Sequence, residues 1–168
     1  MPRRLIDRCR PDSIAEFRAS ARLRFQDGLM LAGRGHRTAA IYLWGYVAEM
    51  TLKAAYFSFT GLTEGSEITV AGHIRPAIAR GKAAPLRIAW PGGGHNVRAW
   101  AELLVGVRAM DPTTAYTPDI EERVQSSGQR IGHLWRETLR YHKNRAYLYE
   151  VQQVHSATEW LLIHSHEL

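Results

Sequence analysis

The segment of residues 37–59 constrains the fold of this chain more than any other part of its sequence. Apolar residues recur along it at steps of three and four, the spacing of one face of an α-helix. This apolar stripe consists of Ile41, Trp44, Ala48, Leu52, Ala55 and Phe59, and it is widened by Leu43, Val47, Met50, Ala54 and Phe57. A surface that broad must be buried against several neighbours. The sequence therefore predicts a central helix from about residue 37 to residue 59.

Four more helices are predicted around the central one, so the expected fold is an all-α, up-and-down bundle of about five helices. The first is expected at residues 13–33, the third at 96–110, the fourth at 117–139 and the last after a break at 140–144. Ser13 and Glu16 have the spacing of a capping box at the start of the first helix. Asn96 and Asn144 are the expected caps of the third and the last helix.

Residues 60–95, between the second and third helices, differ in composition from the rest. They hold seven of the 14 glycines and three of the seven prolines, residues that favour turns over regular elements. We expect a long loop here, with short extended pieces near residues 67–70 and 86–90. A chain of 168 residues has the size of one domain. We therefore expect a single domain, 1–168, with a flexible tail at residues 1–12.

Positive charge is concentrated near the start of the chain. The formal net charge is +6, and residues 1–37 hold nine arginines against four acidic residues. Nineteen of the 22 basic residues are arginine, whose planar guanidinium suits bidentate contact with phosphate. This balance is compatible with an RNA or nucleotide partner. The alternative is that the basic helix faces are solvated and that the arginines reflect a GC-rich genome.

The sequence also argues against several other classes of protein. No uninterrupted apolar run approaches the ~18 residues of a membrane-spanning helix, so no membrane association is expected. The single cysteine, Cys9, cannot form an intramolecular disulfide, which fits a cytoplasmic location. The glycines at 92–94 lack the Lys-Ser/Thr step of a phosphate-binding loop. His164 and His166 lie about 200° apart around a helix, so no metal site is predicted, and no cofactor is expected.

Three short motifs occur in the order in which a known family has them. The central helix places a small residue and a glutamate before a Leu-Lys-Ala step, at Ala48, Glu49, Leu52, Lys53 and Ala54. His95-Asn96-Val97 leads into the third helix, and Arg140-Tyr141 follows Trp135 just before the last helix. Together these motifs resemble those of HEPN domains over most of the chain. The resemblance implies a helical bundle, commonly a homodimer, in proteins that act on or near RNA and nucleotides.

The resemblance implies two kinds of activity. Some HEPN proteins are metal-independent ribonucleases, often toxins paired with an antitoxin, and others are binding modules, including partners of small nucleotidyltransferases. The ribonucleases carry an arginine followed closely by a histidine, and Arg136 and His142 match with five residues between them. A neutral histidine can take the proton of a ribose 2′-hydroxyl while arginine stabilises charge on the phosphate. Glu137 departs from the family pattern, because its negative charge would repel a phosphate.

A second candidate site is basic and aromatic. Arg140, Lys143 and Arg145 stand beside Tyr141 and Tyr147, and such rings stack on bases while the cations bind phosphates. The alternative is that both tyrosines belong to the core and that the cations are solvated. The leading hypothesis is a HEPN-like module that binds RNA or a nucleotide, forms a homodimer, and has a small antitoxin or a nucleotidyltransferase as candidate partner. The alternatives are a ribonuclease that uses the arginine–histidine pair and a non-catalytic oligomerisation module.

Two further polar features have structural interpretations. Glu49 and Lys53 are one helical turn apart in the favourable acid-first order, and we interpret them as a structural ion pair. His95 precedes the third helix, and we interpret it as an anchor that bonds to the loop backbone.

Overall fold

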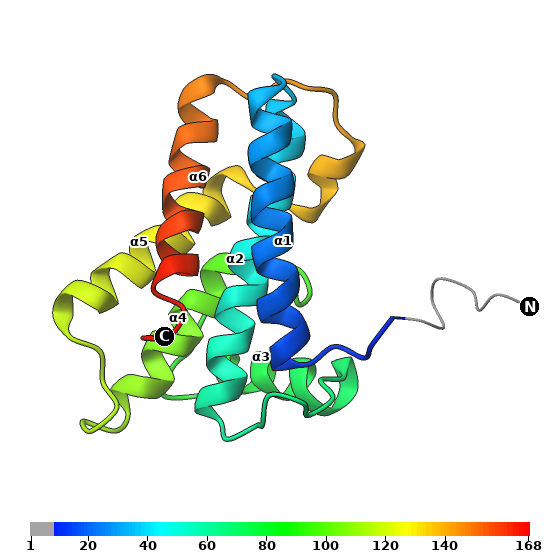
Figure 1. The fold of residues 1–168 in the computed structure, drawn as a ribbon. Helices are drawn as coiled ribbons and strands as arrows, with labels where there is room; N and C mark the ends of the chain where they lie inside the picture. The colour runs from blue at the N-terminus through cyan, green and yellow to red at the C-terminus, as the bar shows by residue number, and fades with distance from the viewer. Residues whose placement is uncertain (1–8) are drawn as a thin grey trace, which may run out of the picture.

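The computed structural model describes residues 9–168, and every regular element in this part of the chain is helical (Figure 1). The α-helices are α1 (Ile14–Gly33), α2 (Arg37–Phe59), α3 (Arg75–Lys82), α4 (Val97–Ala109), α5 (Pro118–Leu134) and α6 (Leu148–Ile163). A π-helical turn, η2 (Val70–Ile74), precedes α3, and a 3₁₀ helix, η3 (Glu137–Tyr141), lies between α5 and α6. The predicted all-α class is confirmed. Residues 1–8 of the predicted tail lie outside the described residues.

Helix α2 is the centre of the bundle, as its broad apolar surface predicts. It packs against α1, α4, α5 and α6, and α1 runs antiparallel beside it (Figure 1). Helix α1 begins at the predicted cap, where the hydroxyl of Ser13 accepts a hydrogen bond of 3.2 Å from the N–H of Glu16. The buried indole of Trp44 donates to the carbonyl of Phe25 at 3.2 Å and so ties α2 to α1. Among the described residues, no helix combines the length and the apolar character needed to cross a membrane.

Residues 60–95 are not the long loop that their glycine and proline content predicts. Helical structure occupies residues 70–82, so the described chain has six α-helices instead of about five, and neither expected extended piece forms a strand there. Pro76 lies in the first turn of α3, a position at which proline is well tolerated. Gly81 faces the ring of Trp90 so closely that a Cβ would lie 2.9 Å from a ring atom. The glycines and prolines of this segment therefore serve packing and helix initiation as well as turns.

Helices α4 and α5 form a closely packed pair. Asn96 caps α4 as predicted, because its Oδ1 accepts a hydrogen bond of 3.0 Å from the N–H of Ala99. Gly128 would weaken an isolated helix, yet it lies where α5 meets α4, and a Cβ there would be 2.5 Å from that of Ala101. The glycine lets the two helices approach more closely than any larger residue would allow.

The chain between α5 and α6 leaves α-helical geometry earlier and returns to it later than predicted. Helix α5 ends at Leu134 instead of near residue 139, because Trp135 has extended backbone and turns into the core. The N-cap of α6 is Tyr147, whose N–H donates to the carboxylate of Glu150 at 2.7 Å. Asn144 is therefore not the cap of the last helix. The resulting irregular segment, residues 135–147, carries the candidate site residues.

Candidate functional site

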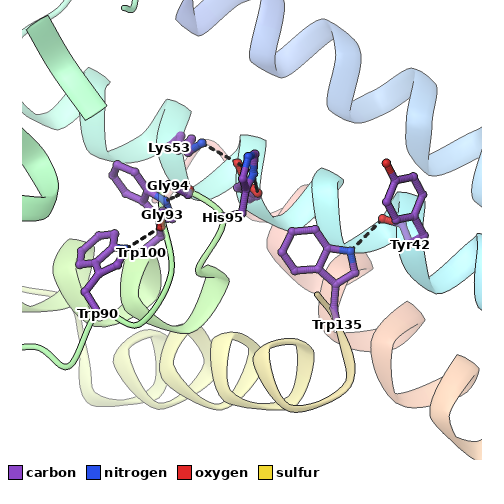
Figure 2. Close-up of polar contacts among 9 residues, drawn as sticks. Tyr42, Lys53, Trp90, Gly93, Gly94, His95, Trp100 and Trp135 are labelled. Carbon is purple, nitrogen blue, oxygen red and sulfur yellow. Dashed lines mark hydrogen bonds and ion pairs between the residues drawn. The ribbon is translucent and has the colours of Figure 1, made fainter. Parts of the chain in front are cut away.

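Trp135 fixes the start of the irregular segment against α2. Its side chain is buried, and its Nε1 donates a hydrogen bond of 3.0 Å to the carbonyl of Tyr42 (Figure 2). The indole lies over Gly45, where a Cβ would approach three ring atoms to less than 3.0 Å. Any side chain at position 45 would therefore displace the ring. The packing of one glycine against one tryptophan positions the segment that follows.

Asn144 fixes the end of the same segment. Its Oδ1 accepts a hydrogen bond of 3.0 Å from the N–H of Thr38, and its Nδ2 donates to the carbonyl of Gly35 at 2.8 Å. The hydroxyl of Thr38 in turn accepts from the N–H groups of Arg145 and Ala146 at 2.8 and 3.0 Å. Thr38 lies in the first turn of α2, whose N–H groups have no partners within the helix. Asn144 thus caps α2, a helix that lies 106 residues before it.

The tyrosines of the predicted cluster are exposed and are not part of the core. Tyr141 is 74% exposed and Tyr147 is 65% exposed. The guanidinium carbon of Arg140 lies 4.7 Å from the centre of the Tyr141 ring. The rings of Tyr147 and Tyr149 are stacked, with centroids 5.8 Å apart. We define the basic-aromatic surface as Arg140, Tyr141, Lys143, Arg145, Tyr147 and Tyr149.

Two arginines at the junction of α1 and α2 add charge beside this surface. Arg34 and Arg37 are exposed and are next in sequence to Gly35 and Thr38, whose backbone groups bond to Asn144. Lys143 and Arg145 are exposed on the other side of the same contact. Within the described residues, none of these four cations forms an ion pair. Their positive charge therefore remains directed at solvent.

A pocket of about 300 Å³ opens beside the basic-aromatic surface. Its lining combines the apolar side chains of Ile41, Leu134, Leu139 and Ala146 with Thr38, His142, Lys143, Arg145, Tyr147 and Glu150. This volume is at the lower end of the roughly 300–1,000 Å³ that ligand pockets have. His142, a predicted catalytic residue, belongs to this pocket.

Arg136, the other member of the predicted catalytic pair, lines a separate pocket of about 210 Å³. Its Nη1 donates hydrogen bonds to the carbonyls of Gly132 and Trp135. Within one chain, Arg136 and His142 therefore do not share a pocket. Catalysis by this pair stays a prediction.

A buried ionic cluster lies behind the Arg136 pocket. Glu49 and Lys53 are only 3% and 8% exposed, and they form the predicted ion pair, with Nζ 2.5 Å from Oε1. The Nδ1 of His95 lies 3.1 and 3.0 Å from the two carboxylate oxygens of Glu49. The interpretation of His95 as an anchor on loop backbone is therefore wrong, since its partner is a carboxylate on α2. No local signal reveals this contact, because 46 residues separate the two.

Two tryptophans hold the turn that carries His95. The Nε1 of Trp100 donates to the carbonyl of Gly94 at 2.8 Å, and the Nε1 of Trp90 donates to that of Gly93 at 3.2 Å (Figure 2). The Nζ of Lys53 lies 5.5 Å from the centre of the Trp100 ring. Lys53, on α2, and His95, on this turn, both contact the carboxylate of Glu49 (Figure 2). The turn is thus fixed to both α4 and α2.

Two groups in this region have raised pKa values. The hydrogen bond to Glu49 raises the pKa of His95 above its ordinary value of 6.5, against the opposing effects of partial burial and of Lys53. Burial, followed by the influence of Tyr42 and Glu49, raises the pKa of Tyr46 to about 12. The Tyr46 ring lies edge-on to that of His95, with centroids 5.8 Å apart. The surroundings of His95 therefore favour its cationic form.

The remaining histidines do not gather into a metal site. In the part of the chain that the structure describes, no three histidine, cysteine, aspartate or glutamate side chains are grouped as metal ligands. His155 packs against the rings of Phe25 and Trp44, and the Nδ1 of His164 is hydrogen-bonded to the carbonyl of Trp160 at 2.8 Å. Both side chains have structural contacts of their own.

Comparison with protein-family models, with curated proteins and with solved structures gives no match to this chain. The resemblance to HEPN domains therefore rests on the short sequence motifs alone.

Proposed function

We propose that this chain is a HEPN-like module that binds RNA or a nucleotide on its basic-aromatic surface. The observation that supports the proposal most is the exposure of Tyr141 and Tyr147 beside Lys143 and Arg145, two cations that form no ion pair within the described residues. Exposed rings bind bases by stacking, and neighbouring cations bind the phosphates between them.

The exposed rings favour a single strand over a duplex. Stacking on an aromatic side chain contributes roughly 1–3 kcal/mol per base and requires a base whose face is free. Bases of this kind occur in single-stranded RNA, in loops and at ends. Tyr141 and the stacked pair of Tyr147 and Tyr149 offer separate platforms for such bases. Where the ligand is RNA, we therefore propose a single strand of at least two nucleotides.

The fixed geometry of the segment also supports binding. Trp135 holds one end of it in the core, and Asn144 ties the other end to α2 through two hydrogen bonds. A surface held in this way loses little conformational freedom when a ligand binds, so less of the binding energy is spent on ordering. A homodimer, and a small antitoxin or nucleotidyltransferase as partner, remain predictions of the family resemblance.

The proposal can be tested with a fluorescent single-stranded RNA and anisotropy measurements at several salt concentrations. We expect the double substitution Lys143→Gln/Arg145→Gln to weaken binding and to reduce the slope of log affinity against log salt by about 1.4, for two lost phosphate contacts. Arg80→Gln/Lys82→Gln removes the same two charges from the exposed end of α3 and is the matched control. Equal affinities for the two double variants would refute the proposal.

The aromatic part of the proposal needs its own test. Tyr141→Ala should weaken binding by roughly 1–3 kcal/mol at every salt concentration, because it removes a stacking surface and no charge. Tyr141→Phe keeps the ring and should bind RNA as the parent does. A loss in both variants, or in neither, would contradict a stacking role.

A further inference from the structure

We propose that the pocket lined by His95 and Arg136 binds a phosphate group, either as the free ion or as a nucleoside monophosphate. The pocket lies between the turn of residues 91–97 and residues 132–137, away from the basic-aromatic surface. The proposal concerns a second site and does not depend on RNA binding.

His95 is oriented for contact with a ligand. Its Nδ1 is engaged by the carboxylate of Glu49, which is 96% buried as a side chain. The imidazole itself is 47% exposed, and among the described residues no contact engages its Nε2. A buried carboxylate on one ring nitrogen fixes the ring orientation and leaves the other nitrogen for the ligand. When protonated, His95 presents an N–H donor at this position.

Arg136 supplies a second donor group to the same pocket. Only its Nη1 is used within the described chain, by the carbonyls of Gly132 and Trp135. The Nε and Nη2 groups remain for a ligand, and the planar guanidinium matches the geometry of a phosphate. The contacts of Nη1 also limit the rotation of this long side chain, so less freedom is lost on binding.

The size and the rim of the pocket suit a small anion. Its volume of about 210 Å³ is sufficient for a phosphate, and an adjoining hollow of about 560 Å³ shares Pro91, Asn96, Gly132 and Arg136 with it. Gly92 has a positive φ of 78°, and a Cβ on Gly93 would meet nothing within 4 Å. No side chain at these two positions closes the entrance. A phosphate can enter while an attached nucleoside extends into solvent.

The charge of the pocket depends on His95. Glu49 and Lys53 neutralise each other behind it, and Glu137 opposes Arg136 at its edge. The nearby Tyr46 is uncharged in the neutral pH range, as an ordinary tyrosine is, and its pKa is raised further to about 12. Protonation of His95 therefore changes the net charge of these groups from zero to +1. The affinity for phosphate should fall as pH rises through the pKa of this histidine.

The test follows the backbone amide signals of Gly92 and Gly93, which line the pocket and are present in every variant, and in the parent also the ring signals of His95, by NMR while inorganic phosphate, or adenosine monophosphate, is added to the full chain. We expect saturable shifts, and affinities at least tenfold weaker in both His95→Gln and Arg136→Gln. The exposed residues Arg123 and His166 lie outside the pocket, and Arg123→Gln and His166→Gln are the matched controls. The ratio of the parent's phosphate affinity to that of His95→Gln should approach one at high pH, where His95 is neutral. Phosphate itself also titrates, but this affects both proteins equally and cancels in the ratio.

Each outcome of this test has a defined meaning. Tighter binding of the monophosphate than of phosphate identifies a nucleotide as the ligand, and equal binding identifies the free ion. Absence of a saturable shift with either probe, or equal affinities of Arg136→Gln and Arg123→Gln, would overturn the proposal. Lys143→Gln/Arg145→Gln should bind phosphate normally even where RNA binding is lost, so the two proposals fail independently.

Discussion

Gly45 is the residue whose replacement tests most directly how α2 positions the candidate site. A Cβ at this position would lie less than 3.0 Å from three atoms of the Trp135 ring. The nearest of these atoms would be only 2.1 Å away, whereas ordinary contact between carbon atoms requires about 3.5–4.0 Å, so the ring must move by about 1.5 Å in Gly45→Ala. The indole is buried on all sides, and its hydrogen bond of 3.0 Å to the carbonyl of Tyr42 would stretch or break.

The expected loss of stability combines three effects. Overpacking of a filled core costs about 1–3 kcal/mol, and loss of the indole hydrogen bond adds about 1 kcal/mol. Replacing glycine by alanine inside a helix returns about 1 kcal/mol through helix propensity. We therefore expect Gly45→Ala to lower the free energy of unfolding by about 2 kcal/mol, which for a chain of this length corresponds to a fall in Tm of about 4–8 °C.

Urea unfolding followed by circular dichroism measures this change, with Gly33→Ala as the matched control. Gly33 is the last residue of α1, and a Cβ there would meet nothing within 4 Å. Gly33→Ala should therefore be neutral or slightly stabilising. The indole N–H of Trp135 should exchange faster with solvent in Gly45→Ala. Equal stabilities of the two alanine variants, with unchanged exchange at Trp135, would refute the packing argument.

Three further substitutions test the polar contacts. Asn144→Ala should lower stability by about 1–2 kcal/mol, as for other lost helix caps, and speed amide exchange at Thr38; unchanged exchange would contradict the cap. Glu49→Gln should lower the pKa of His95, which NMR titration would show. Because the folded-state pKa of His95 is raised, the ion pair of His95 and Glu49 stabilises the parent below pH 6.5, and this stability is lost as pH rises through the folded-state pKa. Glu49→Gln should abolish this pH dependence of stability. Lys53→Met should raise the pKa of His95 and, by breaking a buried ion pair, lower stability by about 3 kcal/mol in urea unfolding; an unchanged urea midpoint would contradict this.

Local signals in the sequence account for the elements that could be predicted. The extent of α2 follows from its apolar periodicity, and the starts of α1 and α4 follow from Ser13 and Asn96. The ion pair of Glu49 and Lys53 is likewise a contact across one helical turn. In each case the information lies within a few residues of the feature, where side-chain chemistry and helix geometry are sufficient.

Contacts between distant residues account for what could not be predicted. In the sequence, the glycines of residues 60–95 indicate a loop. The structure shows that one of them, Gly81, lies inside a helix, where it packs against Trp90. Asn144 is a helix cap, as predicted, but it caps α2, which begins 107 residues earlier at Arg37, and not α6. The pairing of His95 with a glutamate of α2 is equally non-local. Tertiary packing determines these features, and they cannot be predicted from local patterns in a single sequence.

Both candidate sites rest on one face of α2. Thr38, Tyr42, Gly45 and Glu49 follow one another at steps of four, three and four, and so form one stripe along the helix. Thr38 bonds to the end of the irregular segment, and Glu49 orients His95. Between them, the carbonyl of Tyr42 accepts the hydrogen bond of Trp135, and Gly45 packs against its ring. In the sequence, this stripe of polar, aromatic and small residues falls beside the apolar one and carries no signal of a site. This stripe positions the ligand-binding groups of both sites but does not itself contact ligand. Gly45→Ala should therefore weaken RNA binding and phosphate binding together, although every proposed ligand-binding side chain remains present.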